Sequence, residues 1–223
     1  MLSSRADSSP IVVITGADGR LGHRLVEGYL RHGYRVVAFT RGAAVDGAHQ
    51  ITVDVTDEAS VERAFAEVID TFGRVDVFIQ TVGGWGMAPF RETSLAVWRS
   101  MMELNLTSTF LCFREAARHM TEGAGRLIAI ASRQGAERGV AQQAAYSASK
   151  AGVVRLIEAV AAEFAPNGPT AHALAPSTIL FDDDRASGDG VPVADLVDTC
   201  LFLSSAAGAS FNGATLTAFG RGG

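Results

Sequence analysis

Short apolar runs alternate with amphipathic segments along the chain. The apolar runs are rich in β-branched residues, which favour strands, and the amphipathic segments repeat their apolar residues at helical spacing. The expected strands are residues 11–14, 35–40, 51–53, 75–80, 126–131, 170–175 and 214–218, and the expected helices are residues 21–33, 58–72, 94–120, 145–164 and 194–204. Strands and helices in alternation form βαβ units, so the pattern predicts a doubly wound, mostly parallel α/β sheet in a single three-layer domain.

Length and composition limit the class of protein. The chain has 223 residues, which suits one domain over residues 10–223, preceded by a polar tail, residues 1–9, that we expect to be disordered. Its net charge of −5 argues against a nucleic-acid partner, and no apolar run is long enough for a membrane span. Its two cysteines, Cys112 and Cys200, lack CxxC spacing and suit a reducing compartment. We therefore expect a cytoplasmic protein without membrane segments.

A glycine-rich turn follows the first expected strand. Gly16, Gly19 and Gly22 have the spacing Gly-x-x-Gly-x-x-Gly and lead directly into the first expected helix. Such glycines allow a tight turn and a close approach of the backbone to a pyrophosphate, and the helix N-terminus offers free N–H groups to the anion. Ordinary strand–helix loops can have the same spacing, but the position after the first strand of a βαβ chain favours dinucleotide binding.

The end of the second expected strand bears on which dinucleotide binds. A site for NAD needs an acidic residue about 20 residues beyond the glycines, where it holds the ribose 2′-hydroxyl. The chain has Thr40 and Arg41 there. A guanidinium can bind a 2′-phosphate through two hydrogen bonds, so Arg41 favours NADP over NAD, unless it is only a solvated loop residue.

A catalytic pattern lies further along the chain. Tyr146 and Lys150 are one helical turn apart, and Lys150 is the only lysine among 19 basic residues. Ser132 follows the fifth expected strand, and Asn105 lies inside the expected helix 94–120. Two further motifs are Asp54-Val55 and Pro176-Ser177-Thr178-Ile179. Together, and in this order, these motifs resemble those of the short-chain dehydrogenase/reductase family.

The resemblance implies the family's Rossmann fold, with seven parallel strands and three helices on each face of the sheet. It implies that Asn105, Ser132, Tyr146 and Lys150 form the catalytic group. It also implies a cofactor site with contacts from Gly16, Asp18, Gly19, Arg20, Leu21, Gly22, Arg41, Asp54, Val55, Thr81, Val82, Gly83, Tyr146, Lys150, Pro176, Ser177 and Ile179. Family members pair through their two long helices, here 94–120 and 145–164, so a homodimer or homotetramer is expected.

The catalytic group suits carbonyl reduction. A donor must protonate the carbonyl oxygen, and tyrosine, with an ordinary pKa of about 10, is a weak acid near neutral pH. We expect the Lys150 ammonium to lower the pKa of Tyr146 and, by resemblance, to bind the nicotinamide ribose. Ser132 would donate a second hydrogen bond to the oxyanion, and Asn105 would hold a water that links Lys150 to solvent. A tyrosine and a lysine at this spacing are also common as an exposed pair on a helix.

The chain departs from the family on the substrate side. Gln80-Thr81-Val82-Gly83-Gly84 replaces the usual Asn-Asn-Ala-Gly, and Phe181 stands where a threonine is expected. The segment 181–193, the family's substrate cover, is short and polar, so we expect it to be mobile and its acidic run 182–184 to be solvated. The residues expected to contact a small carbonyl or alcohol substrate are Trp85, Ser132, Gln142 and Tyr146, although Trp85 could equally belong to a protein interface.

Other functions stay open. The histidines are scattered without ligand spacing, so no metal site is expected. A regulator that binds NADP without turnover would share the glycine turn but typically lack the Tyr146–Lys150 pair, and a structural subunit would bind no cofactor. A faint resemblance of Gly83-Gly84-Trp85 to quinonoid dihydropteridine reductases is weakened by Ser132, because those enzymes lack this serine.

Overall fold

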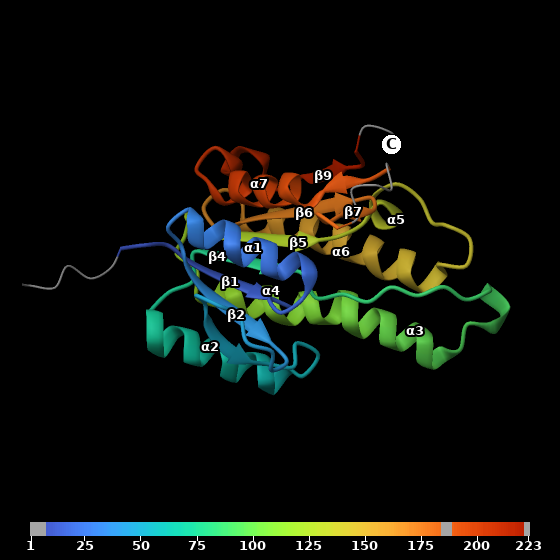
Figure 1. Ribbon diagram of the computed structural model, residues 1–223, viewed down its shortest axis with the longest axis horizontal. Helices are drawn as coiled ribbons and strands as arrows, with labels where there is room; N and C mark the ends of the chain where they lie inside the picture. The colour runs from blue at the N-terminus through green and yellow to red at the C-terminus, as the bar shows by residue number, and fades with distance from the viewer. Residues whose placement is uncertain (1–7, 184–188, 221–223) are drawn as a thin grey trace, which may run out of the picture.

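The computed structural model describes residues 8–183 and 189–220. In this part of the chain, seven parallel strands form one central sheet in the order β3-β2-β1-β4-β5-β6-β9 (Figure 1). The strands are β1 (Ile11–Thr15), β2 (Arg35–Thr40), β3 (His49–Thr52), β4 (Val77–Gln80), β5 (Arg126–Ile130), β6 (Thr170–Pro176) and β9 (Thr215–Ala218). Each overlaps an expected strand, and the predicted parallel α/β fold is confirmed. The strand order reverses between β1 and β4, and sheets of this kind bind ligands at the carboxyl ends of the strands beside such a reversal.

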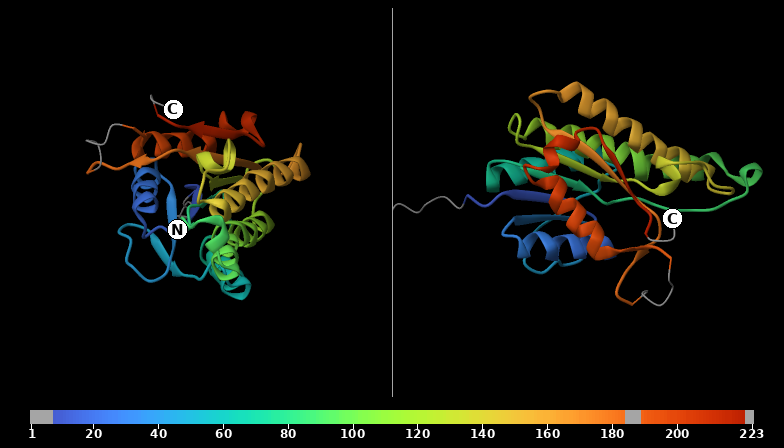
Figure 2. Two further views of the ribbon diagram at one scale, coloured as in Figure 1. Left: turned by 90° about the vertical axis from the view of Figure 1, so that its right-hand side faces the viewer. Right: turned by 90° about the horizontal axis from the view of Figure 1, so that it is seen from above.

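Helices cover both faces of the sheet (Figures 1 and 2). The helices of one face are α2 (Glu58–Phe72), α4 (Ser108–Arg118) and α6 (Ala144–Phe164), and those of the other are α1 (Arg20–Arg31) and α7 (Val193–Ser204). Phe65, Phe113 and Ile157 from the first face lie in one buried cluster, whereas Leu25 and Leu196 from the second lie in another. The sheet therefore separates two apolar cores.

The face with α1 and α7 has two long helices, where the resemblance implied three. Residues 41–48, between β2 and β3, form a loop. Gly42 and Gly47 lie near its ends with φ angles of 132° and 76°, and the residues between them amount to about one helical turn, too few to cross the sheet. Val45 from this loop is buried in the core of that face, where it covers part of the sheet.

The expected helix 94–120 is divided by a wide turn. It consists of α3 (Leu95–Met102), the π-helical turn η2 (Glu103–Thr107) and α4. A π turn carries an extra residue, and such turns are frequent at functional sites. The hydroxyl of Thr109 donates to the carbonyl of Asn105 at 2.7 Å, so a carbonyl inside the wide turn keeps a hydrogen bond. The turn itself contains Asn105.

The segment 181–193 directly follows one short strand and contains another near its end. β7 (Ile179–Leu180) and β8 (Val191–Pro192) form a small parallel pair before α7, and residues 184–188 lie outside the described residues. Three further short elements are η1 (Phe90–Glu92), α5 (Arg133–Ala136) and η4 (Gly208–Phe211).

Of the expected tail, only Ser8 and Ser9 are among the described residues. The carbonyls of Ser8 and Ser9 accept hydrogen bonds from Nη2 of Arg74 at 3.2 and 3.3 Å, and residues 1–7 lie outside the described residues. Cys112 and Cys200 are buried free thiols. Within the described ranges, no helix is long and apolar enough to cross a membrane.

Candidate active site

A cavity of about 530 Å³ opens beside the glycine turn, at the carboxyl ends of β1, β2 and β4. The residues expected at the cofactor that line it are Gly16, Asp18, Gly19, Arg20, Leu21, Gly22, Arg41, Asp54, Val55, Thr81, Val82 and Gly83. Its lining also includes Thr40, already noted beside Arg41, and residues that the sequence did not single out, namely Phe39, Val53, Thr56 and Leu104. Most of these additional residues lie at or just after the carboxyl ends of strands. Parallel α/β sheets bind their ligands at these ends, so the residues could have been expected from their positions. The other residues expected at the cofactor are not among the lining residues, namely Tyr146, Lys150, Pro176, Ser177 and Ile179.

The glycine turn is shaped by two close approaches. Gly16 has a φ of 58°, and a Cβ at Gly22 would lie 2.1 Å from the carbonyl oxygen of Gly16. Neither position could therefore carry a side chain without moving the turn. Gly19 is the N-cap of α1, and no side chain caps this helix end, which leaves the N–H groups of its first turn for an anion.

The residues that replace Asn-Asn-Ala-Gly form their own network. The Thr15 hydroxyl donates to Oε1 of Gln80 at 3.0 Å, and Nε2 of Gln80 donates to the hydroxyl of Ser108 at 3.2 Å. The hydroxyl of Thr81 donates to the carbonyl of Thr15 at 2.5 Å. These bonds join β1, β4 and α4 directly beneath the cavity. Thr15 and Ser108 could not be predicted from the sequence because their partners are distant along the chain.

Gly83 joins the cavity to the catalytic candidates. A Cβ at Gly83 would lie 2.6 Å from Oδ1 of Asn105 and 3.0 Å from Nζ of Lys150. Asn105 and Lys150 therefore pack against Gly83, which lines the cavity, although neither side chain is itself a lining residue. The amide of Asn105 bonds to both backbone groups of Gly84, at 2.9 and 3.0 Å, and donates to the hydroxyl of Ser149 at 3.0 Å. In this structure Asn105 fastens the loop after β4 to α6, and the water-holding role expected for it stays a prediction.

Lys150 is buried, with 5% of its surface exposed. Its Nζ donates to the carbonyl of Ile130, at the end of β5, at 2.8 Å. Burial lowers its pKa from 10.5 to about 8. The alternative interpretation of Tyr146 and Lys150 as an exposed helical pair is therefore wrong.

Tyr146 and Ser132 lie close to each other. Burial raises the pKa of Tyr146, and the nearby Ser132 hydroxyl lowers it by a smaller amount. The expected lowering by Lys150 is not found, because the ammonium points to the Ile130 carbonyl instead. The Ser132 hydroxyl oxygen is itself buried and has no hydrogen bond of normal geometry among the described residues. The Ser132 hydroxyl is therefore free to donate a hydrogen bond to a substrate oxygen.

The family assignment follows from the whole chain. The profile of the family described as short chain dehydrogenase matches residues 10–187. The chain belongs to the short-chain dehydrogenase family. Members of this family are NAD(P)-dependent oxidoreductases, and this dehydrogenase therefore uses a nicotinamide cofactor to interconvert small alcohols and carbonyl compounds.

Three similar proteins cover most of the dehydrogenase. D-threitol dehydrogenase of Mycolicibacterium smegmatis is 30% identical over 92% of this chain and 90% of its own length. Sorbitol dehydrogenase of Cereibacter sphaeroides is 30% identical over 80% of this chain and 72% of its own length. The crystal structure of sorbitol-6-phosphate 2-dehydrogenase from Erwinia amylovora has a TM-score of 0.84 and 26% identity, over 94% of this chain and 98% of that one.

The residues of the dehydrogenase fit a nicotinamide dinucleotide. The glycine turn has no space for a Cβ at Gly16 or Gly22, so its backbone stays tightly wound beside the cavity, and the uncapped N-terminus of α1 suits the pyrophosphate. Arg41 lines the cavity beside Asp54, whose pKa is lowered mainly by hydrogen bonds from Thr56 and further by the Arg41 charge. The glycine turn, Arg41 and the Gly83 wall therefore border one continuous cavity.

Two of the expected substrate residues, Trp85 and Gln142, lie on neighbouring loops. Trp85 is 61% exposed on the loop after β4, and Gln142 is exposed on the loop before α6. The N–H of Ala88 donates to the carbonyl of Gln142 at 2.8 Å, which ties the two loops together. Gln142 has a φ of 64°, a strained conformation for a residue with a side chain. The substrate contacts of Trp85 and Gln142 stay predictions.

The dehydrogenase shows no metal centre among residues 8–183 and 189–220, where no three potential ligands gather. His172 is instead a core residue of β6. Its ring nitrogens bond to the carbonyl of Phe211 and the hydroxyl of Thr170, both at 3.0 Å, and burial lowers its pKa to about 4.

Proposed function

We propose that this dehydrogenase prefers NADP(H) to NAD(H) and that Tyr146 exchanges the proton with a small alcohol or carbonyl substrate. The observation that best supports this is the burial of Lys150, the only lysine in the chain, beside Gly83 on the cavity wall. A buried ammonium lowers the stability of a fold, so its presence one turn from Tyr146 argues for a chemical role.

Each catalytic side chain has a distinct task in this proposal. The bound cofactor supplies or accepts the hydride. Tyr146 gives its proton to the carbonyl oxygen or takes it from the alcohol, and Ser132 donates a hydrogen bond to the same oxygen. Lys150, with a pKa of about 8, can lose and regain a proton near neutral pH, which suits it to return a proton to Tyr146. Asn105 positions the loop around Gly83.

The preference for NADP rests on Arg41. Its side chain lines the cavity, and the residue before it, the buried Thr40, leaves no carboxylate at the end of β2 to bind a ribose 2′-hydroxyl. The change Arg41→Ala should weaken NADPH by about 1.5–3 kcal/mol, the strength of a charged hydrogen bond, and leave NADH nearly unchanged. Fluorescence titration with both cofactors measures the difference.

A matched control separates this contact from a general loss of positive charge. Arg63→Ala removes another exposed guanidinium, on α2, outside the cavity lining. It should leave both affinities unchanged. Equal weakening of NADPH and NADH by Arg41→Ala, or tighter binding of NADH by the unmodified protein, would remove the NADP assignment.

Turnover with a substrate panel tests the activity itself. Threitol and sorbitol are the first alcohols to assay with NADP⁺, because the similar dehydrogenases are named for them. Cofactor binding without turnover of any alcohol or carbonyl compound would favour the regulator instead. Failure to bind either cofactor would favour a structural subunit.

We further infer that the dehydrogenase forms a homodimer through α3, α4 and α6. α3 has no buried residue, and its Leu95, Val97 and Trp98 are exposed. Between α4 and α6, Phe110 and Leu156 line an apolar groove of about 410 Å³. A second copy would cover both surfaces. Analytical ultracentrifugation decides this point, and a monomer at micromolar concentration would reject it.

A further inference from the structure

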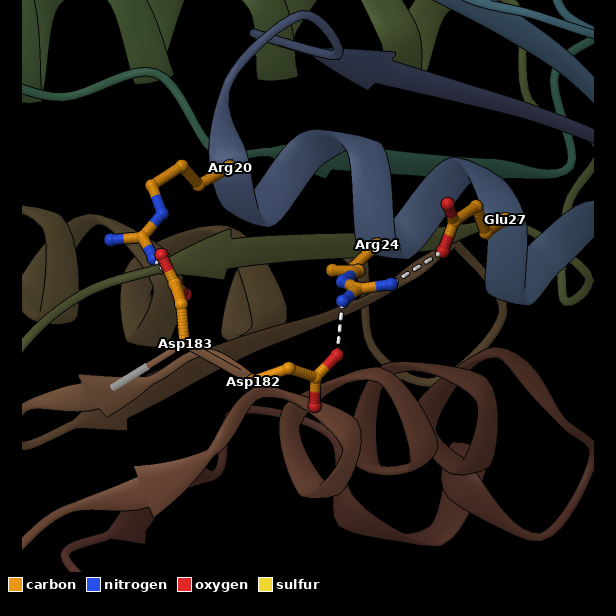
Figure 3. A network of polar contacts seen from close by, with 5 residues as sticks. All are labelled: Arg20, Arg24, Glu27, Asp182 and Asp183. Atoms are coloured by element: carbon orange, nitrogen blue, oxygen red, sulfur yellow. Dashed lines mark hydrogen bonds and ion pairs between the residues drawn. The ribbon is translucent and has the colours of Figure 1, made fainter. Parts of the chain in front are cut away.

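Arg20 connects the cofactor cavity to a segment that follows β7. It is the first residue of α1 and lines the cavity. Its Nη2 lies 2.5 Å from Oδ1 of Asp183, and its guanidinium carbon lies 4.0 Å from the centre of the Phe181 ring (Figure 3 shows the ion pair). The acidic run was expected to be solvated, and its described residues, Asp182 and Asp183, are exposed while each forms an ion pair with α1. Asp184 lies outside the described residues.

A second ion pair lies one turn further along α1. Arg24 bonds to Asp182 and also to Glu27 at 3.1 Å (Figure 3). Arg24 and Asp182 line a separate pocket of about 120 Å³ near α7 and are not among the lining residues of the cofactor cavity. Adjacent acidic residues therefore hold two arginines one helical turn apart, and one of those arginines faces the cavity.

The position of Arg20 lets it meet an anionic ligand as well as Asp183. A dinucleotide's pyrophosphate binds at the N-terminus of the helix after a glycine turn, and Arg20 begins that helix. A guanidinium binds a carboxylate and a phosphate through the same planar arrangement of N–H donors. The Asp183 carboxylate therefore occupies the Arg20 guanidinium, which could otherwise bind the pyrophosphate.

We propose, on the basis of the cofactor role given above, that Asp183 competes with the cofactor pyrophosphate for Arg20. Cofactor binding exchanges the Arg20–Asp183 ion pair for an Arg20–phosphate contact and detaches Asp183 from the first turn of α1. The Arg24–Asp182 pair lies outside the lining of the cofactor cavity and takes no part in the exchange. Asp183 thus limits cofactor affinity and speeds cofactor release.

The exposure of the pair makes this exchange easy. The side chains of Arg20 and Asp183 are 55% and 75% exposed, so water replaces their contact at little cost. The attraction between exposed charges weakens as salt concentration rises. The competition should therefore be modest and dependent on salt.

The test is a set of titrations with Asp183→Asn, which removes the charge and keeps the size of the side chain. It should tighten NADPH and ADP-ribose about 2- to 5-fold at low salt, the range of an exposed ion pair, and slow NADPH release by a similar factor. Adenosine 2′-phosphate lacks a pyrophosphate, so its affinity should not change. The matched control Asp182→Asn removes the same charge one residue away and should leave all three affinities unchanged.

A second variant shows whether the effect passes through Arg20. In an Arg20→Gln background, Asp183→Asn should no longer tighten NADPH. Weaker NADPH binding by Asp183→Asn would show that Asp183 positions Arg20 instead, and an equal gain from Asp182→Asn would show a nonspecific charge effect. Either result overturns the competition. If the unmodified protein binds neither cofactor, the proposed function and the proposed competition both fail. If it binds NADPH but Asp183→Asn does not tighten that binding, only the competition is refuted.

Discussion

Replacing Lys150 with methionine should remove the activity and change how stability depends on pH. Methionine has a similar length and fills the buried space without a charge. Turnover should fall by about 10²–10⁴-fold, the usual contribution of general acid–base catalysis. Lys150→Arg keeps a charge but has a wider, planar head whose pKa lies too high for proton exchange, so it should lose activity as well.

The magnitude of the stability effect follows from the pKa of Lys150. Burial lowers this pKa from 10.5 to about 8. At about 1.36 kcal/mol per pKa unit, burying the ammonium costs about 3 kcal/mol of unfolding free energy. The folded-state pKa is the lower one, so between pH 8 and 10.5 the unfolded chain binds more protons than the folded chain. The cost is therefore complete below pH 8 and disappears as the pH rises towards 10.5.

Methionine also removes a hydrogen bond. The Ile130 carbonyl loses its bond from Lys150, which costs about 1–3 kcal/mol at every pH. At pH 7 the Lys150→Met variant should thus be about as stable as the unmodified protein, or up to about 2 kcal/mol more stable. From pH 7 to pH 9.5 the unfolding free energy of the unmodified protein should rise by about 2 kcal/mol relative to that of Lys150→Met.

Urea unfolding of the cofactor-free proteins at pH 7 and 9.5 measures this change. Arg155→Met is the matched control, because it removes an exposed cation from the same helix and should give a difference that does not vary with pH. If the difference between Lys150→Met and the unmodified protein is also constant with pH, the ammonium is not desolvated and the reasoning from burial fails. Retained turnover in Lys150→Met would refute the catalytic role.

Two further changes test the site and the core. Gly83→Ala should lower turnover by about 100-fold or more, because its Cβ would intrude on Asn105 and Lys150, whereas Gly86→Ala, with open space around it, should have little effect in the same assay. The pKa of His172 is lowered to about 4, so the unfolded chain takes up a proton below about pH 6.5 before the folded chain does, and stability should fall as the pH drops from 6.5 to 4. His172→Gln should flatten this loss in urea unfolding at pH 7 and 4.5, and an unchanged slope would assign the loss to other groups.

The parts of the fold that sequence could predict depend on local pattern. Strands 35–40 and 126–131 have continuous apolar runs, and the spacing of Gly16, Gly19 and Gly22 specifies a turn by local backbone geometry alone. The third helix that the resemblance implied on the face with α1 and α7 is replaced by the loop 41–48. Gly42 and Gly47, both with positive φ, leave only about one helical turn of residues between them. The π turn around Asn105 was also missed, since a single extra residue barely alters helical periodicity.

The parts of the site that sequence could not predict depend on partners far along the chain. Lys150 bonds to Ile130 and lies against Gly83, and Arg20 pairs with Asp183 across 163 residues. Apolar spacing places a residue on a face of a helix, but it does not say which carbonyl or carboxylate faces it there. The expected effect of Lys150 on the pKa of Tyr146 was wrong for this reason.

Unfavourable features point to the same site without reference to any family. Ser132, Gln143 and Ser147 each have a buried polar atom without a hydrogen bond among the described residues, and Gln142 has a positive φ. All four lie within 20 residues before Lys150, itself a buried cation. Folding alone would favour none of these features, and unmet hydrogen bonds and strain tend to persist where function requires them. Arg114 and Thr215 also have an unpaired buried atom but stand apart from this segment. The unpaired buried polar atoms, the strained backbone and the Tyr146–Lys150 motif therefore mark the same region by independent arguments. We assign the catalytic site to that region.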